Sequence, residues 1–178
     1  MAPMLIRSAA VDDAAAIHAL HNAAFTPHNP GVTGELPEAR LVDELRADGD
    51  LLPELSLVAV REGQVIGHAC SSPGRIGDDA KSAIGFGPLG VLPEHQRTGA
   101  GAALVHATVG AANALGYQLV MLLGSPEYYS RFGFVLAGTL GITPPVAEWA
   151  PYFQALPLAA YRPENHGAFR YAPAFDRL

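Results

Sequence analysis

The pattern of apolar and polar residues in the first fifty positions predicts one short strand followed by two helices. Residues 5–7 have the composition of a strand. Asp12 is a suitable N-cap for a helix that runs to about Phe25, and Pro37 begins a second helix that ends at Gly49. The residues expected to face inward are Ile17, Leu20, His21 and Ala24 on the first helix, and Leu41, Val42 and Leu45 on the second.

The middle of the chain reads as a hairpin, and then as a strand, a helix and a further strand. Residues 55–60 and 64–72 are predicted to pair around a turn, and residues 84–92 form the next strand. A helix over residues 100–115 leads to a buried strand at 118–123, which we expect to lie parallel to the preceding strand in a right-handed crossover. The predicted buried stripe of that helix is Leu104, Val105, Thr108, Ala111, Ala112 and Leu115.

Glycine is unusually frequent in the predicted strand at 84–92, at Gly85, Gly87 and Gly90. Glycines inside a strand mark a bulge or the close approach of another group, which includes a ligand. The expectation is therefore a bulged strand beside a bound molecule.

The last part of the chain is predicted to contain a short helix and a closing set of strands. Ser125 is a candidate N-cap for a helix that ends at Gly133, and a strand begins at Phe134. Two more strands are expected at 152–158 and 167–171. Because helices and strands are mixed along the chain without a linker or repeat, we predict an α+β fold with one central mixed sheet in a single domain, residues 1–178.

Composition narrows the classes of protein that fit. The chain has 178 residues, enough for one substantial core, and a formal net charge of −6. That charge argues against a nucleic-acid partner and is compatible with a cationic small substrate. No apolar run is long enough to span a membrane and no signal peptide is evident, so we expect a cytoplasmic protein. The single cysteine, Cys70, reads as a buried structural thiol in preference to a nucleophile.

The segment between the strand at 84–92 and the following helix carries the clearest chemical signal. Residues 96–101, Q-R-T-G-A-G, place free backbone N–H groups at a helix N-terminus, which is an anion site. A P-loop would need Lys where Ala102 stands. A dinucleotide fingerprint would need a small residue at Leu104 and repeated βαβ units.

A third pattern, Q-x-x-G-x-G, matches at Gln96, Gly99 and Gly101. A further pattern, Y-x-x-x-G-F, begins at Tyr129 and lies inside the segment L-G-S-P-E-Y-Y-S-R-F-G-F. On these motifs the chain resembles the GCN5-related N-acetyltransferase (GNAT) family, in an uncharacterised bacterial branch with an L-G-x-P-x-Y-Y motif. The resemblance covers about residues 4–136, and the strands at 140–178 are expected to vary.

The resemblance implies the acyl-CoA N-acyltransferase fold, in which the sheet is splayed between strands four and five, and it implies an acetyl-CoA site. Loop amides would bind the pyrophosphate, and pantetheine would run along the preceding strand. The cofactor-binding residues implied are Leu89, Gly90, Val91, Gln96, Arg97, Thr98, Gly99, Ala100, Gly101, Ala102 and Tyr129.

The resemblance also implies direct attack of an amine on the thioester in a ternary complex. Tyr129 would protonate the departing CoA, while Tyr128, about 100° away on a helix, would pack elsewhere. The family often places a general base on the fourth strand, but residues 84–92 contain no acid or base. The remaining candidates for the general base are His68 and Glu38, followed by Glu35 and His21. No metal is expected, because no carboxylate completes a site with His18, His21 and His28.

The function expected is therefore an acetyl-CoA-dependent N-acetyltransferase acting on a primary amine of a small molecule or peptide. Two alternatives stay open: a non-catalytic acyl-CoA-binding regulatory module, and transfer of a longer acyl group. The partners implied are acetyl-CoA and the amine, in a monomer or a homodimer. The aromatic residues of the tail could line the acceptor pocket, close a dimer or pack in the core; they are Trp149, Tyr152, Phe153 and Tyr161.

Overall fold

The computed structural model describes residues 1–79 and 82–178 in full, and residues 80 and 81 only as part of a strand. The helices are α1 (Ala14–Phe25), α2 (Pro37–Asp48), α3 (Ala100–Ala114) and α4 (Pro126–Tyr129). The strands are β1 (Met4–Ser8), β2 (Leu57–Arg61), β3 (Gln64–Ile76), β4 (Asp79–Val91), β5 (Leu119–Leu123), β6 (Val135–Leu136), β7 (Ile142–Thr143), β8 (Phe153–Pro157) and β9 (Gly167–Arg170).

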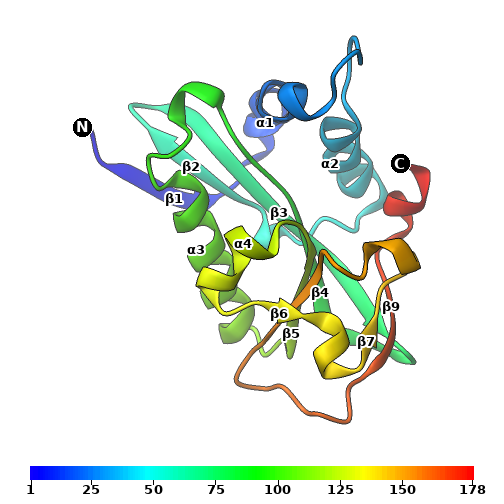
Figure 1. Cartoon of the computed structure of the whole chain (residues 1–178). Helices are drawn as coiled ribbons and strands as arrows, with labels where there is room; N and C mark the ends of the chain where they lie inside the picture. Colours follow the sequence, from blue (N-terminus) through cyan, green and yellow to red (C-terminus); the bar gives the residue numbers. More distant parts are fainter.

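One mixed sheet organises the molecule (Figure 1), as the sequence predicts. Its strands lie in the order β1-β2-β3-β4-β5-β8-β6, and β9 pairs with both β3 and β7. Neighbours along the main path are antiparallel except β4 and β5, which pair in parallel at Ala83–Leu119, Ile84–Val120 and Gly85–Met121. Beyond Gly85 β4 continues to Val91 with no further β5 partner among the described residues. The two strands therefore part at that point.

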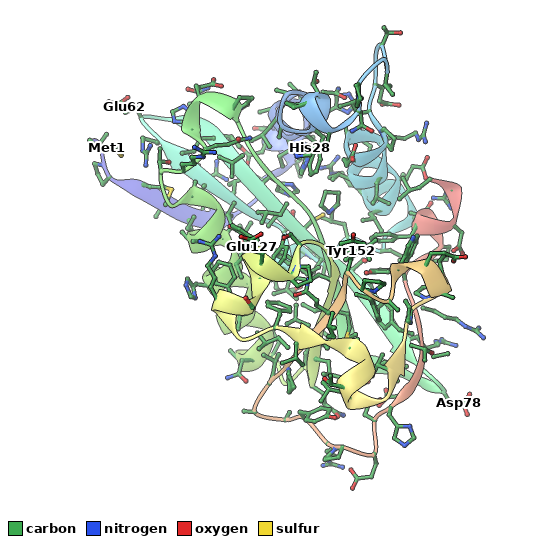
Figure 2. The ribbon with its side chains drawn as sticks, viewed as in Figure 1. Met1, His28, Glu62, Asp78, Glu127 and Tyr152 are labelled. Atoms are coloured by element: carbon green, nitrogen blue, oxygen red, sulfur yellow. The ribbon has the colours of Figure 1, made fainter. Side chains whose placement is uncertain are left out.

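The long β3–β4 hairpin forms the centre of the sheet. Glu62, in the turn before β3, and Asp78, in the turn after it, lie at opposite ends of the molecule (Figure 2). α1 packs on one face of this hairpin, with Leu20 and His21 against Gly90, and α3 packs on the other face, with Leu104 against Gly67. The hairpin is thus covered on both sides.

Several predicted helix details are corrected. Asp12 does not cap α1, because a 3₁₀ turn at Val11–Asp13 precedes the helix and Asp13 instead accepts the Ala10 N–H and pairs with Arg7. Ser125 occupies the N-cap position of α4 without a side-chain hydrogen bond.

The predicted stripe of α3 is wrong at Leu115, which is 53% exposed because the helix ends at Ala114 and the chain turns away through Gly116. The remaining predicted face is buried or half-buried, and the inward faces of α1 and α2 are confirmed.

Strand bounds also differ from the prediction. β2 begins at Leu57 because residues 53–55 form a 3₁₀ turn, and both strands of the β3–β4 hairpin are longer than the apolar pattern indicated. The short strand β1, the crossover strand β5 and the closing strands β8 and β9 lie where they were predicted.

Two of the three β4 glycines, Gly85 and Gly90, are explained by the protein's own side chains, and Gly87 by its positive φ of +126°. The β3–β4 register shifts between Ala69 and Ser71, where Gly87 and Pro88 stand opposite Cys70, so β4 carries the expected β-bulge. A Cβ at Gly85 would lie 2.8 Å from the Tyr171 ring, and one at Gly90 would lie 2.9 Å from His21 Nδ1. The close approach at these two glycines is therefore made by internal side chains in the direction that a Cβ would take, and a ligand beside the backbone of β4 stays a prediction.

Cys70 is fully buried in β3, and its Sγ lies 3.4 Å from the Gly87 carbonyl oxygen. Burial raises the pKa of this thiol to about 12, so it stays protonated at neutral pH. The prediction of a structural thiol agrees with this position. No helix in the described part of the chain is long and apolar enough to cross a membrane.

Two glycine substitutions, one of them a control, test the packing at the C-terminal end of β3. A Cβ at Gly74 would lie 2.5 Å from the buried Phe169 ring, so Gly74→Ala should lower the free energy of unfolding by about 1–3 kcal/mol. The control is Gly110→Ala on the exposed face of α3, where nothing lies within 4 Å and helix propensity should add about 0.5–1 kcal/mol. Urea unfolding of both variants measures the difference, and equal changes would contradict this packing.

Candidate active site

The loop that joins β4 to α3 is held in an unusual backbone conformation. A 3₁₀ turn at Pro93–His95 leads into Arg97, with φ +60°, and Gly99, with φ +91°, which is the residue before α3. The Gln96 side chain donates to the Val91 carbonyl at 3.2 Å, and the Thr98 hydroxyl donates to the His95 carbonyl at 2.7 Å. The polar side chains of the loop thus fix its own shape.

This shape leaves the backbone donors of the loop free. Among the described residues, no backbone acceptor is present for the N–H groups of residues 97–102, whereas the Ala103 N–H donates to the Gly99 carbonyl at 2.9 Å. These N–H groups are gathered at the N-terminus of a helix of 15 residues, where its dipole is positive. The loop can therefore bind an anion, as the sequence predicts.

A cavity of about 480 Å³ opens beside the loop. Six of the predicted cofactor-binding residues line it: Val91, Gln96, Arg97, Gly99, Gly101 and Ala102. The other predicted residues do not line this cavity; they are Leu89, Gly90, Thr98, Ala100 and Tyr129.

Two residues of the cavity wall escaped the sequence reasoning. Tyr128 lines the cavity, and its hydroxyl lies 3.1 Å from the position of a Cβ on Gly101. The expectation that Tyr128 packs away from the loop is therefore wrong. Arg131 also lines the cavity, with its guanidinium 4.2 Å from the centre of the Tyr128 ring. Its spacing of three residues from Tyr128, about one helical turn, was the signal that could have placed it there.

Tyr129 lies deeper than Tyr128, on the side of α4 that faces the sheet. Its ring packs edge-on to Phe134 with centroids 5.7 Å apart, and it covers Gly124, where a Cβ would lie 2.6 Å from the ring. Burial raises the pKa of the Tyr129 phenol above its usual range, so the hydroxyl keeps its proton at neutral pH. Gly124 directly follows β5, at the point where β4 and β5 have separated.

His68 lies at the centre of a buried polar chain. His68 Nδ1 is 2.8 Å from His21 Nε2, and His68 Nε2 is 3.0 Å from the Ser56 hydroxyl. The remaining His21 nitrogen, Nδ1, is buried against Gly90 and has no partner among the described residues. His68 is thus fully buried with both nitrogens occupied, and a proton can reach it only through His21 or Ser56.

Glu38 lies at the start of α2 and is partly exposed. Its carboxylate accepts from the Asn29 side chain at 3.4 Å. Nearby, one ligand atom from each of His18, Glu35 and Asp43 lies within 4.8 Å of the others, so the expectation that His18 has no carboxylate neighbour is wrong. These groups are already paired, since His18 Nδ1 is 2.7 Å from Asp43, which also accepts from Arg46 at 2.8 Å.

The tail aromatics have separate roles. Trp149 lines a second cavity, Tyr152 is 56% exposed, Phe153 is fully buried, and Tyr161 packs against the same core as Phe153. They do not form a single aromatic wall.

Comparison with known proteins identifies the class. Residues 15–134 match the model of the acetyltransferase (GNAT) family. The chain therefore belongs to this family, and the resemblance drawn from its loop and Y-x-x-x-G-F motifs is confirmed.

Individual relatives support the same class. The chain is 39% identical over 135 residues, 75% of each chain, to the uncharacterized N-acetyltransferase YhbS of Escherichia coli (strain K12). A crystal structure of YhbS in complex with CoA matches with a TM-score of 0.90 and 32% identity, covering 100% of this chain and 94% of that one. A GNAT family acetyltransferase from Brucella melitensis, in complex with acetyl-CoA, matches with a TM-score of 0.79 and 35% identity, covering 99% and 100%.

The buried histidine pair predicts how stability depends on pH. Burial lowers the pKa of His21 to about 4 and that of His68 well below its usual range, so both are neutral in the folded protein. The unfolded chain takes up these protons below about pH 6.5. Folding stability should therefore be complete above pH 6.5 and fall as the pH drops from 6.5 to 4, by up to about 3 kcal/mol for His21 alone.

Urea unfolding between pH 4.5 and pH 8 measures this slope, and the histidine ring resonances report the two titrations directly. The variant His166→Gln, at an exposed histidine of the tail, is the control and should keep the slope. A flat profile, or ring resonances that titrate near pH 6.5, would contradict the neutral buried pair.

Proposed function

We propose that this chain is an acetyl-CoA-dependent N-acetyltransferase that moves an acetyl group to a primary amine of a small molecule or peptide. The observation that carries the proposal is the set of free N–H groups at residues 97–102, which faces a cavity beside the end of β4. The CoA and acetyl-CoA complexes of the two structural relatives support the same ligand.

CoA binding would use the loop and β4 together. The loop amides would hold the pyrophosphate, and Arg97 and Arg131 would add positive charge on the two sides of the cavity. Pantetheine would follow Leu89, Gly90 and Val91, on the stretch of β4 that β5 has left. The separation of the two strands would thus give the thioester a place inside the sheet.

The reaction would be direct attack by the amine on the thioester carbonyl. The carbonyl oxygen gains negative charge in the transition state, and a backbone N–H near Val91 would stabilise it. As the carbon–sulfur bond breaks, the sulfur leaves with the electron pair, and Tyr129 would protonate it. The Tyr129 phenol is protonated at neutral pH, so it has a proton to donate.

The amine must lose one proton, and the two expected bases differ in access. His68 could receive a proton from the amine only by relay through His21 or Ser56, because both of its own nitrogens are engaged. Glu38 is partly exposed, and only Asn29 contacts its carboxylate among the described hydrogen bonds. We therefore propose Glu38 as the base, acting directly or through a water molecule.

Cofactor binding gives the first test of the proposal. The chain should bind acetyl-CoA in a calorimetric titration, and a thiol reagent should detect free CoA when amines are added. Gly101→Val should raise the Kd for acetyl-CoA at least about tenfold, because the side chain would enter the cavity and displace phosphate from the amides. Gly110→Val, on the exposed side of the same helix, is the matched control and should leave Kd unchanged.

The outcomes of this titration separate the alternatives. Absence of acetyl-CoA binding would overturn the proposal. Binding without thiol release across a wide panel of amines would favour a regulatory acyl-CoA-binding module. Faster release from a longer acyl-CoA would favour that acyl group as the natural one.

The proton-transfer roles give a second test. Tyr129→Phe and Glu38→Gln should each lower kcat by about 10²-fold or more, because each removes one proton transfer from the transition state. Neither change should move the Kd for acetyl-CoA by more than about twofold, since neither residue lines the loop cavity. Tyr152→Phe, at an exposed tyrosine that does not line the loop cavity, is the control for loss of a tyrosine hydroxyl and should keep kcat. Full kcat in either variant would remove that residue from the mechanism.

A further inference from the structure

One buried ring nitrogen has no part in the proposed mechanism. His21 on α1 is fully buried, and its Nδ1 has no hydrogen-bond partner among the described residues. A polar atom left unpaired in an apolar interior costs about 1–3 kcal/mol, and buried polar groups in native folds are rarely left in that state. This nitrogen is therefore a candidate for contact with a molecule that binds.

The nitrogen lies against the stretch of β4 that β5 has left. Nδ1 is 2.9 Å from the position of a Cβ on Gly90, so the imidazole takes the space that a side chain would fill there. Gly90 directly precedes Val91, and the proposed path of pantetheine follows both residues. Leu20 Cδ2 lies 3.1 Å from the same Cβ position, so a methyl group adjoins the nitrogen. Rotation of this leucine side chain would open Nδ1 to a molecule beside β4.

The hydrogen bonds around β4 show which of its backbone groups face the gap. The Leu92 N–H donates to the Ile66 carbonyl on β3 at 2.9 Å. Because backbone groups alternate in direction along a strand, the Gly90 N–H also points to β3 and the Val91 N–H points away from it. The Val91 carbonyl agrees with this direction, since the Gln96 side chain donates to it at 3.2 Å. An oxygen that accepts from the Val91 N–H thus lies one residue from the point that His21 covers.

The hydrogen-bond chain behind His21 favours one position for its proton. His21 Nε2 is 2.8 Å from His68 Nδ1, and His68 Nε2 is 3.0 Å from the Ser56 hydroxyl. If Ser56 donates to His68, then His68 donates to His21, and the neutral His21 ring carries its proton on Nδ1. The opposite direction would leave the Ser56 hydroxyl proton without an acceptor among the described hydrogen bonds. His21 Nδ1 is therefore assigned as a donor.

We propose that His21 Nδ1 donates a hydrogen bond to the carbonyl oxygen of the bound thioester, beside the Val91 N–H, and that His68 and Ser56 hold its proton in place. That oxygen gains negative charge as the amine attacks, so a buried donor aimed at it stabilises the transition state more than the ground state. A neutral imidazole can donate without bringing a charge into the core. His21 keeps its proton throughout, so the proposed proton transfers are unchanged. The identity of the thioester rests on the proposed acetyltransferase function.

The ring nitrogen resonances test the donor without any substitution. In protein labelled with ¹⁵N, Nδ1 of both His21 and His68 should carry the proton at neutral pH, and Nε2 of both rings should be unprotonated. A proton on His21 Nε2 would overturn the proposal, because Nδ1 would then be an acceptor. This measurement decides the question even if a substituted chain does not fold.

Two cofactor analogues then test the contact with the carbonyl. Acetyl-CoA and S-ethyl-CoA differ at the thioester carbonyl, which is a methylene group in S-ethyl-CoA. His21→Gln can place its amide at the Nε2 position, which keeps a partner for His68 and removes the donor at Nδ1. In calorimetric titrations this variant should raise the Kd for acetyl-CoA about three- to tenfold and leave the Kd for S-ethyl-CoA unchanged. The control His166→Gln, at an exposed histidine, should change neither value.

The carbonyl itself gives a signature that a purely structural role would not move. With acetyl-CoA labelled with ¹³C at the carbonyl carbon, the bound resonance should lie downfield of the free one in the wild-type chain, and this shift should shrink in His21→Gln. His21→Asn, which can place an amide N–H near the Nδ1 position, should keep more of the shift. Equal weakening of both analogues, or the same shift in the wild-type chain and His21→Gln, would overturn the inference.

Thiol release separates this inference from the function beneath it. With the most active amine of the panel, His21→Gln should lower kcat about 10²-fold, the usual effect of removing one such donor. Release at the wild-type rate in this variant would overturn the inference and leave the acetyltransferase function in place. A carbonyl shift that depends on His21, without thiol release for any amine, would contradict the transferase function and leave the contact in place.

Discussion

The short parallel contact between β4 and β5 is the constraint on which the rest of the structure depends. Pairing covers only residues 83–85 of β4 and residues 119–121 of β5, and the strands separate after it. The crossover helix α3 must therefore begin where β4 has already separated from β5, which places its N-terminus and the loop at residues 96–101 beside the gap. An anion at that helix terminus and a molecule between the strands become parts of one site.

The antiparallel neighbours keep this gap open at a fixed place. β3 stays paired with β4 up to Val91, and β8 stays paired with β5 up to Leu123, so each separated strand is held from its outer side. The polar chain from Ser56 through His68 to His21 then fixes α1 on β4 at Gly90. Removing either histidine would leave a buried nitrogen without its partner, which is costly in an apolar setting. The expected path of pantetheine is thus bordered by strands that their outer neighbours and α1 hold in place.

The sequence predicts well where local chemistry decides, and poorly where distant contacts decide. Gly49 and Gly116 end α2 and α3 because their φ values are positive, and the apolar spacing of α1 identifies its buried face. The loop motif fixes the anion site because the free N–H groups follow from local backbone geometry. By contrast, Tyr128 enters the cavity because its hydroxyl packs against Gly101 at the start of α3, and no spacing rule reports that tertiary contact.

The β4 glycines illustrate the same limit, since a missing Cβ reports crowding but not the identity of the neighbour, which here is Tyr171 or His21.

The net charge of the whole chain is also a poor guide to the charge at a site. A net charge of −6 suggests a cationic substrate, yet the arginines that form ion pairs with acids in the described chain lie on β1, on α2 and near the C-terminus. Acids neutralise those arginines, whereas Arg97 and Arg131 line the loop cavity without an acid among the lining residues, so the local potential at the loop is opposite in sign to that of the whole chain. Recognition depends on the local value, because a Debye length of about 8 Å screens the distant acids.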